Sequence, residues 1–204
     1  VYSELIDNSE YEPFDGIVLT DSFQLYEQEK DLIANLLPDN SQRRTNQKKR
    51  NIRVILGNPP YSVGQSSADD NAANIKYFNL DKRIEETYAS YSKATNKNLL
   101  YDSYIRAFRW ASDRVGDEGV IGFVTNGGWL DGNATTGFRK CLMDEFNEIY
   151  LLNLKGNSRK TREIQKKEGE GIFGSGSRAT IVITILFKSK DHTNRGKIYY
   201  SEIG

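Results

Sequence analysis

Short apolar stretches alternate along the chain with longer segments in which apolar residues recur every three or four positions. The short stretches are rich in Ile, Val, Leu and Tyr, a composition typical of strands. Residues 54–56 are continuously apolar and 181–186 are apolar except for Thr184, which favours strands that are covered on both faces. The pattern predicts six strands, at 15–20, 52–57, 120–125, 148–154, 178–187 and 197–201.

Three helices are predicted between these strands, and the alternation favours an α/β fold. The clearest helix spans 98–115 and ends at Gly116; its apolar stripe consists of Leu100, Tyr104, Phe108, Ala111 and Val115. A second is expected at 134–146, with Asn133 as its N-cap, and a third at 23–37, ending before Pro38.

The length of 204 residues and the ordinary composition predict one domain, 1–204. The polar stretches 62–97 and 155–177 are expected to be long irregular loops, which at that length are more often functional than idle. A single cysteine, Cys141, excludes an internal disulfide, and with a single histidine it argues against zinc chemistry, so no metal is expected. The chain has no run of about 18 apolar residues and no secretory signal pattern, so we expect a cytoplasmic protein without membrane contact.

The 28 basic and 28 acidic side chains cancel overall but are unevenly placed. Residues 4–31 are mostly acidic, whereas two clusters are basic. Either cluster suits phosphate groups, and a solvated charged loop is the simpler alternative for each. The first cluster comprises Arg43, Arg44, Lys48, Lys49, Arg50 and Arg53, and the second Lys155, Arg159, Lys160, Arg162, Lys166 and Lys167.

The sequence Asn58-Pro59-Pro60-Tyr61 comes directly after the strand predicted at 52–57. Two prolines fix two φ angles and remove two backbone donors, so neither a strand nor a helix continues and the carbonyl groups stay available. The aromatic residue then lies at the carboxyl edge of the sheet, where open α/β sheets bind ligands.

This arrangement suits methyl transfer to an exocyclic amine such as the amino group of adenine. The nitrogen lone pair is delocalised into the ring, and two acceptors aimed at the two amine hydrogens make the nitrogen more nucleophilic. The side-chain oxygen of Asn58 and the carbonyl of Pro59 are two such acceptors, with Pro60 holding the turn. Preorganised groups of this kind are worth roughly 2.7–4 kcal/mol. Tyr61 offers a flat face on which a base can stack after leaving the duplex.

These four residues resemble the signature of S-adenosylmethionine-dependent methyltransferases that modify amino groups, and Asn in first place resembles the adenine-N6 enzymes. Leu19-Thr20-Asp21-Ser22-Phe23 is similar to the family motif whose acid binds the adenine moiety of the cofactor, with helix capping as the alternative role for Asp21. Residues 119–130 resemble the strand and turn after the catalytic motif, where packing is expected. Gly171-Ile172-Phe173 is similar to the late motif in which Phe173 packs against the flipped adenine, with a plain core position as the alternative.

The resemblance covers residues 14–188, and the order of motifs is that of γ-type adenine methyltransferases in large single-chain restriction-modification enzymes. It implies S-adenosylmethionine as cofactor, double-stranded DNA as substrate, and a Rossmann-like class I methyltransferase sheet that is mostly parallel with an antiparallel C-terminal strand. The family's glycine-rich cofactor turn and ribose-binding acid have no match before Asp15. We therefore expect an incomplete catalytic domain that works with the remainder of a larger polypeptide.

Two other functions remain open on the sequence alone. Glutamine-N5 protein methyltransferases share Asn-Pro-Pro-Tyr, although the basic clusters and the insertion after Tyr61 favour a polyanion. A catalytically silent fragment that binds DNA is the second. The glycines of 169–176 spell a nucleotide-loop pattern, but a charged run precedes them and a strand comes after them, which argues against a phosphate loop.

Overall fold

The computed structural model describes residues 16–27, 36–60, 76–155, 180–191 and 194–203. These residues divide into two compact units, Val1–Arg50 and Asn51–Gly204. Asn51–Gly204 contains the sheet and the helices that pack on it, and it carries the Asn-Pro-Pro sequence.

The first unit corrects two predictions. Residues 16–20 do not form the strand expected at 15–20, because the Asn40 side chain takes the place of a neighbouring strand: Leu19 N–H donates to Asn40 Oδ1 at 2.8 Å, and Asn40 Nδ2 donates to Leu19 O at 2.9 Å. The helix predicted at 23–37 is not formed over residues 23–27, which form a turn, and residues 28–35 lie outside the described residues; a helix begins at the proline instead, as α1 (Pro38–Lys49). Proline in the first helical turn loses no hydrogen bond, so it starts a helix as readily as it ends one.

Five strands of the second unit form one open sheet in the order β1-β2-β4-β3-β5. Four of them point the same way, and β4 runs antiparallel to its neighbours β2 and β3. The predicted mostly parallel α/β sheet is confirmed, with the antiparallel strand as the penultimate one. The strands are β1 (Val54–Gly57), β2 (Gly119–Asn126), β3 (Glu148–Asn153), β4 (Ile181–Lys188) and β5 (Lys197–Glu202).

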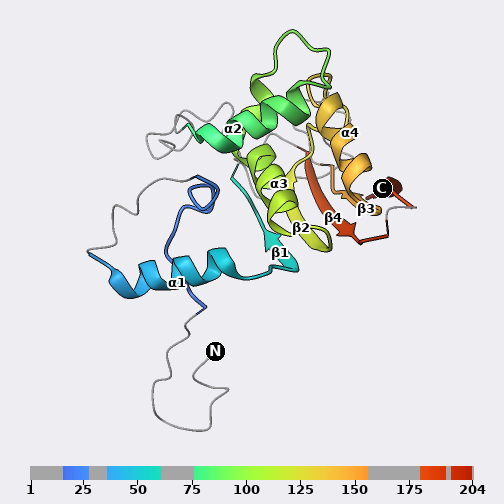
Figure 1. Cartoon of the computed structure of the whole chain (residues 1–204). Helices are drawn as coiled ribbons and strands as arrows, with labels where there is room; N and C mark the ends of the chain where they lie inside the picture. The colour runs from blue at the N-terminus through green and yellow to red at the C-terminus, as the bar shows by residue number, and fades with distance from the viewer. Residues whose placement is uncertain (1–15, 28–35, 61–75, 156–179, 192–193, 204) are drawn as a thin grey trace. The chain divides into compact units, whose positions relative to one another are not determined.

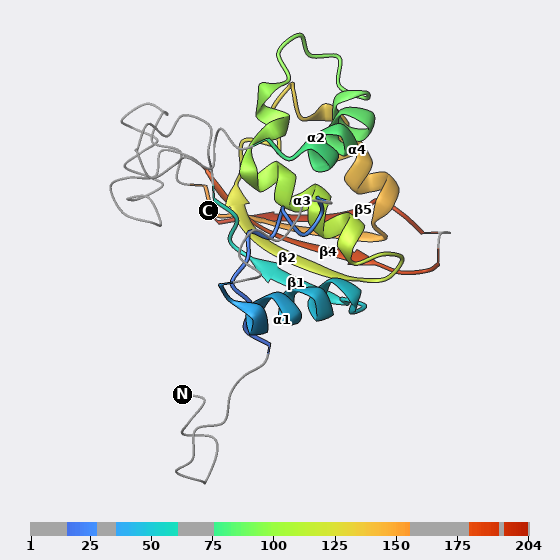
Figure 2. The ribbon, with the colours of Figure 1, turned by 60° about the vertical axis from the view of Figure 1, so that its left-hand side comes forward.

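The helices of this unit lie on one face of the sheet (Figures 1 and 2). The predicted helices shorten to α3 (Ser103–Arg114), after the 3₁₀ turn η3 (Asn98–Tyr101), and α4 (Thr136–Glu145), whose N-cap is Thr135 and not Asn133. The stretch 62–97, predicted to be irregular, contains α2 (Phe78–Ile84) and the π-helical turn η2 (Glu85–Ala89). Among the described helices, none is both long enough and apolar enough to span a membrane.

Aromatic side chains form the centre of the core between the sheet and these helices. Phe108 of α3 makes edge contacts with Phe123 of β2, with a centroid distance of 5.1 Å, and with Trp129 at 5.9 Å. Phe138 of α4 contacts both Trp129 and Tyr88, at 5.2 and 4.9 Å. Trp129 is therefore a core residue, which agrees with the packing role expected for residues 119–130.

A buried ion network joins α3 to α4. The guanidinium of Arg109, with a side chain only 1% exposed, donates to both carboxylate oxygens of Glu145 at 2.7 and 2.9 Å and to Asp113 at 2.5 Å. Ser112 Oγ also donates to Glu145. Burial favours protonation of Glu145, but the Arg109 hydrogen bond and charge, with the Ser112 bond, outweigh it and hold the pKa of that carboxyl below its ordinary value of 4.5.

We predict that Glu145→Gln lowers the free energy of unfolding by about 3 kcal/mol, the lower end for breaking one side of a buried ion pair. Because the folded pKa is depressed, the contribution of Glu145 is present above about pH 4.5 and is lost as the pH falls through the folded value. Urea titrations from pH 3 to 7 measure both effects. Asp144→Asn, which breaks the exposed pair with Lys140, is the control and should cost about 0.2–1 kcal/mol. Equal losses in the two variants would contradict the prediction.

Candidate functional site

Asn58, Pro59 and Pro60 leave the carboxyl end of β1 as extended chain without regular structure. Asn58 and Pro60 are exposed and Pro59 is half-buried. Among the described residues, none forms a hydrogen bond with the Asn58 side chain. The predicted acceptors therefore lie at the sheet edge where the sequence put them, accessible to a ligand. Tyr61 lies outside the described residues.

The packing of Gly57 on a core side chain fixes where the segment 58–60 begins. Gly57 pairs with Phe123 in the parallel β1–β2 ladder, and a Cβ built on Gly57 would lie 3.3 Å from the Phe123 ring. Phe123 is 4% exposed and is itself packed against Phe108. The aromatic core thus extends to the carboxyl end of β1, directly before Asn58.

Tyr77, near the start of the next described part of the chain, is also held in place. Tyr77 is 3% exposed, and its N–H donates to Asp81 Oδ2 at 3.3 Å. Asp81 also receives two hydrogen bonds from the buried Arg106 of α3, Nε to Oδ1 at 2.7 Å and Nη2 to Oδ2 at 2.9 Å. Such a bidentate pair of hydrogen bonds between a guanidinium and a carboxylate is strong and directional. Both ends of the insertion after Pro60 are therefore anchored on the same core.

The ends of a second long segment lie at this edge of the sheet. Leu154 N–H donates to Ile181 O at 2.9 Å, and Ile181 N–H donates to Lys155 O at 3.2 Å, so the chain leaves β3 and returns into β4 at one point. The carboxyl ends of β1 and β3 lie on the same edge of the sheet, and β4 is two strand spacings from β1, roughly 10 Å. Phe173 belongs to the segment between these ends and lies outside the described residues.

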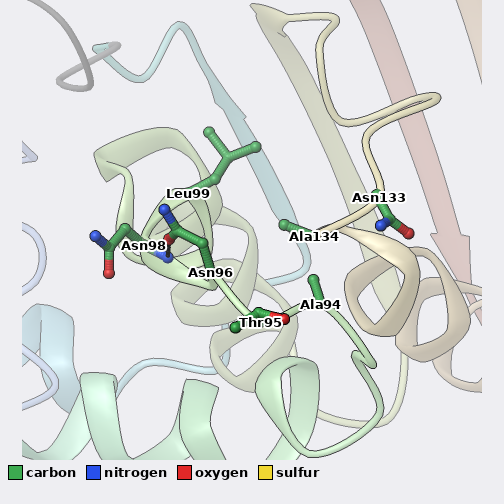
Figure 3. Close-up of a pocket in the computed structure, with 7 residues that line it drawn as sticks. All are labelled: Ala94, Thr95, Asn96, Asn98, Leu99, Asn133 and Ala134. Atoms are coloured by element: carbon green, nitrogen blue, oxygen red, sulfur yellow. Dashed lines mark hydrogen bonds between the residues drawn. The ribbon is translucent and has the colours of Figure 1, made fainter.

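A cavity of about 590 Å³ lies between two loops (Figure 3). One loop precedes α3, and the other comes after the carboxyl end of β2. Ala94 and Ala134 face each other across the cavity, while the other lining residues are mostly polar: Thr95, Asn96, Asn98, Leu99 and Asn133. Most of the surface that faces the cavity is apolar, and three neutral amides, those of Asn96, Asn98 and Asn133, are placed around it.

Arg139 and Thr135 hold the loop after β2 in place. Arg139 Nη1 donates to the carbonyls of Trp129 and Gly132 at 2.7 and 2.9 Å. Thr135 Oγ1, which is fully buried, donates to the same Trp129 carbonyl at 2.9 Å. The loop is therefore tied to α4, and the wall formed by Asn133 is fixed at its base.

Asp21 belongs to the first unit and is exposed. Its Oδ1 accepts the N–H of Phe23 at 2.9 Å, at the start of a short turn over 22–27. This hydrogen bond belongs to an Asx turn and not to the helix N-cap that the sequence left open as the alternative, because residues 22–27 form a turn. The predicted contact with the cofactor stays a prediction.

Of the two basic clusters, the structure describes the first and only the beginning of the second. Arg53 forms an ion pair with Glu118, and Lys48 Nζ donates to Glu27 O at 3.2 Å. Lys155 pairs with Glu202 at 3.3 Å. These cations are engaged within the protein, so a role in binding phosphates rests on the remaining members. Among the described residues, no group of three His, Cys, Asp or Glu side chains could hold a metal ion.

Sequence reasoning missed the residues that support the motif. Arg106 lies outside the apolar stripe predicted for the helix 98–115, yet it is 5% exposed and binds Asp81. The sequence gives no sign that a cation on the polar face of a helix is buried when the carboxylate that pairs with it lies in a stretch predicted to be a loop. The glycine before Asn58 was a detectable signal, because glycine inside a strand often marks a close approach.

Comparison with known proteins gives one family and several solved structures. The model of the family "Eco57I restriction-modification methylase" matches residues 3–159. The chain is 45% identical to the ATP-dependent Type ISP restriction-modification enzyme LlaBIII bound to DNA, with a TM-score of 0.90, covering 100% of this chain and 13% of that one. A nuclease-deletion mutant of the Type ISP enzyme LlaGI, in complex with a DNA substrate mimic, gives 45% identity, a TM-score of 0.89, and coverage of 100% and 16%.

The DrdV–DNA complex is a third match, with 35% identity, a TM-score of 0.83, and coverage of 95% and 19%. This chain thus spans less than a fifth of the length of each of these three solved relatives. Among curated proteins, none is significantly similar to it.

We predict that Gly57→Ala destabilises the fold by about 1–2 kcal/mol, because the new methyl group would lie 3.3 Å from the ring of the buried Phe123, closer than an ordinary contact, so the ring must shift. Phe123→Leu opens that space, so the Ala substitution should cost at least about 0.5 kcal/mol less in the Phe123→Leu background. Chemical denaturation of the four proteins of this cycle measures the coupling. Additive effects would show that Gly57 and Phe123 do not constrain each other.

Proposed function

The chain belongs to the Eco57I restriction-modification methylase family, and we propose that it is the catalytic segment of a DNA adenine-N6 methyltransferase. The observation that carries the proposal is the Asn58-Pro59-Pro60 segment at the carboxyl end of β1, with an exposed Asn58 side chain. Close packing between Gly57 and the Phe123 ring fixes where this segment begins. The match to a methylase family supports methyl transfer, and the DNA in the solved relatives supports a nucleic-acid substrate over a protein glutamine.

In the proposed mechanism, Asn58 Oδ1 and the Pro59 carbonyl accept the two hydrogens of the adenine amino group. The nitrogen lone pair is thereby freed from the ring and forms a bond to the methyl carbon, while the carbon–sulfur bond of the donor breaks. Positive charge develops on the nitrogen, so both acceptors bind more strongly in the transition state than before it. The nitrogen then loses one proton to water and remains a methylated amine.

The target base must leave the duplex to reach these acceptors. Tyr61 comes directly after Pro60, and Phe173 lies in the segment whose ends meet at Lys155 and Ile181, on the same sheet edge. We assign Tyr61 to one face of the base and Phe173 to the other. Stacking on an aromatic side chain returns about 1–3 kcal/mol toward the cost of unstacking.

S-adenosylmethionine is the proposed cofactor, and when bound it supplies an activated methyl group. The described residues fit one part of its site. Asp21 carries an exposed carboxylate that the Phe23 N–H orients, which suits the adenine amino group of the cofactor. The glycine turn and the ribose-binding acid of the family have no counterpart in this sequence, so the remaining contacts are assigned to other parts of a longer polypeptide.

Double-stranded DNA is the proposed macromolecular partner. Arg43, Lys49 and Arg50 are the members of the first basic cluster assigned to phosphates, since Arg53 and Lys48 are engaged within the protein. Sequence recognition is assigned to polypeptide outside this chain, because phosphate contacts position a duplex without reading its bases.

Asn58→Ala in the complete polypeptide should lower the rate of adenine methylation about 10²–10³-fold, as removal of one preorganised hydrogen-bonding group does elsewhere. Asn58→Asp keeps an acceptor oxygen and should retain more activity. Asn51→Ala, at an exposed asparagine ahead of β1, is the matched control. Transfer of a labelled methyl group is measured beside DNA affinity, which should stay constant. Full methylation by Asn58→Ala would exclude the proposed role.

Calorimetric titration of this 204-residue chain with S-adenosylmethionine, with and without adenine-containing duplex, tests whether the chain holds its cofactor alone. We expect no measurable binding by the folded chain, because Asp21 is the single cofactor residue assigned to it. Micromolar binding would contradict the division of the cofactor site between this chain and further polypeptide. Salt-dependent DNA binding by a complete polypeptide that neither binds the cofactor nor methylates would favour the silent DNA-binding fragment.

A further inference from the structure

Asn126 lies at the same edge of the sheet as the Asn58-Pro59-Pro60 segment. It is the last residue of β2, which pairs in parallel with β1 as far as Gly57 opposite Phe123. Beyond that pair both chains continue for three residues, to Pro60 and to Asn126. Neighbouring strands lie about 4.8 Å apart, so a base bound at Asn58 is within reach of the Asn126 side chain.

The Asn126 side chain does not belong to the core. Phe123 and Thr125 of the same strand are 4% and 0% exposed beneath the helices, and side chains alternate along a strand, so that of Asn126 points to the other side. Asn126 is half-buried, and Asn58, which comes directly after the partner of Phe123, is exposed. Both asparagines are therefore available to a ligand at this edge.

One hydrogen bond fixes which way the Asn126 amide points. Its Oδ1 accepts the N–H of Gly128 at 2.7 Å, and a backbone N–H can bind only the oxygen of an amide side chain. The nitrogen, Nδ2, therefore points away from Gly128 with two hydrogens to donate. Within the described parts of the chain, no group accepts either of them.

The backbone that carries this amide is held on both sides. Asn126 pairs with Ile181 in the β2–β4 ladder, and the next N–H, that of Gly127, donates to Thr180 O at 2.6 Å. Trp129, three residues after Asn126, is packed in the aromatic core. The Nδ2 donor is therefore preorganised, and little freedom is lost when a ligand accepts from it.

Two acceptors and one donor at neighbouring strand ends match the hydrogen-bonding edges of adenine. On each of its two edges the amino group, which donates, lies beside a ring nitrogen that only accepts: N1 on the Watson–Crick edge and N7 on the other. Asn58 Oδ1 and the Pro59 carbonyl are the proposed acceptors for the amino hydrogens. Asn126 Nδ2 is a donor on the adjacent strand, in the place that a ring nitrogen requires.

We propose that Asn126 binds the target base, with Nδ2 donating a hydrogen bond to the ring nitrogen beside the amino group. Contacts to the amino group alone leave the ring free to turn about it, and a donor to the ring nitrogen fixes its direction. The hydrogen bond to Gly128 explains the oxygen of the Asn126 amide and not its nitrogen. The inference rests on the proposed adenine methylation and adds a residue to that site, from a segment where only packing was expected.

Target bases that lack one ring nitrogen test this contact in the complete polypeptide. Methyl transfer is measured on duplexes whose target is adenine, 1-deazaadenine or 7-deazaadenine, with the wild-type protein, Asn126→Ala and Asn126→Asp. Asn126→Asp removes the donor but keeps an acceptor for the Gly128 N–H, so the turn is retained. Asn51→Asp makes the same change at an exposed asparagine ahead of β1 and is the control. Thermal unfolding midpoints establish that each variant is folded.

With the wild-type protein, one of the two analogues should lower kcat/KM about ten-fold relative to adenine, because the Asn126 donor then loses its acceptor. The analogue that responds identifies the ring nitrogen. In Asn126→Ala and Asn126→Asp, methylation of adenine itself should fall about ten-fold, and the same analogue should cost less than about two-fold more. Intrinsic differences in reactivity between the bases cancel in this comparison of variants. Asn51→Asp should keep the wild-type pattern.

An unchanged analogue penalty in the Asn126 variants would overturn the inference, because a residue that only shapes the turn would lower the rates on all three bases equally. Wild-type rates that do not distinguish adenine from either analogue would overturn it as well. Both results leave the proposed function intact, since they require a wild-type polypeptide that methylates adenine. A wild-type polypeptide that does not methylate adenine would overturn the proposed function and this inference together.

Discussion

The contact of the Phe123 ring with the backbone of Gly57 is the constraint on which the candidate site depends. It connects the end of a four-residue strand, β1, to an aromatic cluster that also holds α3 and α4. Pro59 and Pro60 stiffen the chain around Asn58, but the whole segment would be displaced as a unit if the strand end moved. The aromatic core prevents this, because a close-packed interior transmits a shift at one ring to its neighbours. The packing of the core therefore determines the position of the two acceptors.

Much of the second unit could be predicted from the sequence, and the reasons are local. Strands such as β4 are runs of β-branched and aliphatic residues that few other structures accommodate, and α3 has a complete apolar stripe. The position of Asn58 could be inferred from two prolines after such a strand. The prediction failed for the first unit because its structure depends on a single side chain, Asn40, that satisfies the backbone of Leu19 in place of a strand partner. No periodicity indicates a replacement of that kind.

The buried arginines were not predictable for a related reason. Arg106 and Arg109 lie on the helix α3 between apolar neighbours, and each is neutralised by a carboxylate from another element, Asp81 of α2 or Glu145 of α4. Burial of such charges is acceptable only with complete pairing, and pairing is a property of the tertiary structure. The pair formed by Arg106 holds α2 to the core together with two fully buried apolar side chains of that helix, Leu80 and Ile84.

The place of β4 between β2 and β3 has a consequence for the time course of folding. β1 and β2 form one parallel pair and β3 and β5 another, and β4 alone joins them. β4 is made of residues 181–188, so a ribosome must synthesise nearly the whole segment before the first pair can meet the second. Until then the nascent chain holds the β1–β2 pair and the strand β3 without its neighbours, because β5 is made after β4, and the contacts that join them are distant in sequence and form slowly. Such a sheet assembles late in translation, and until then its unpaired strands must be kept from aggregating.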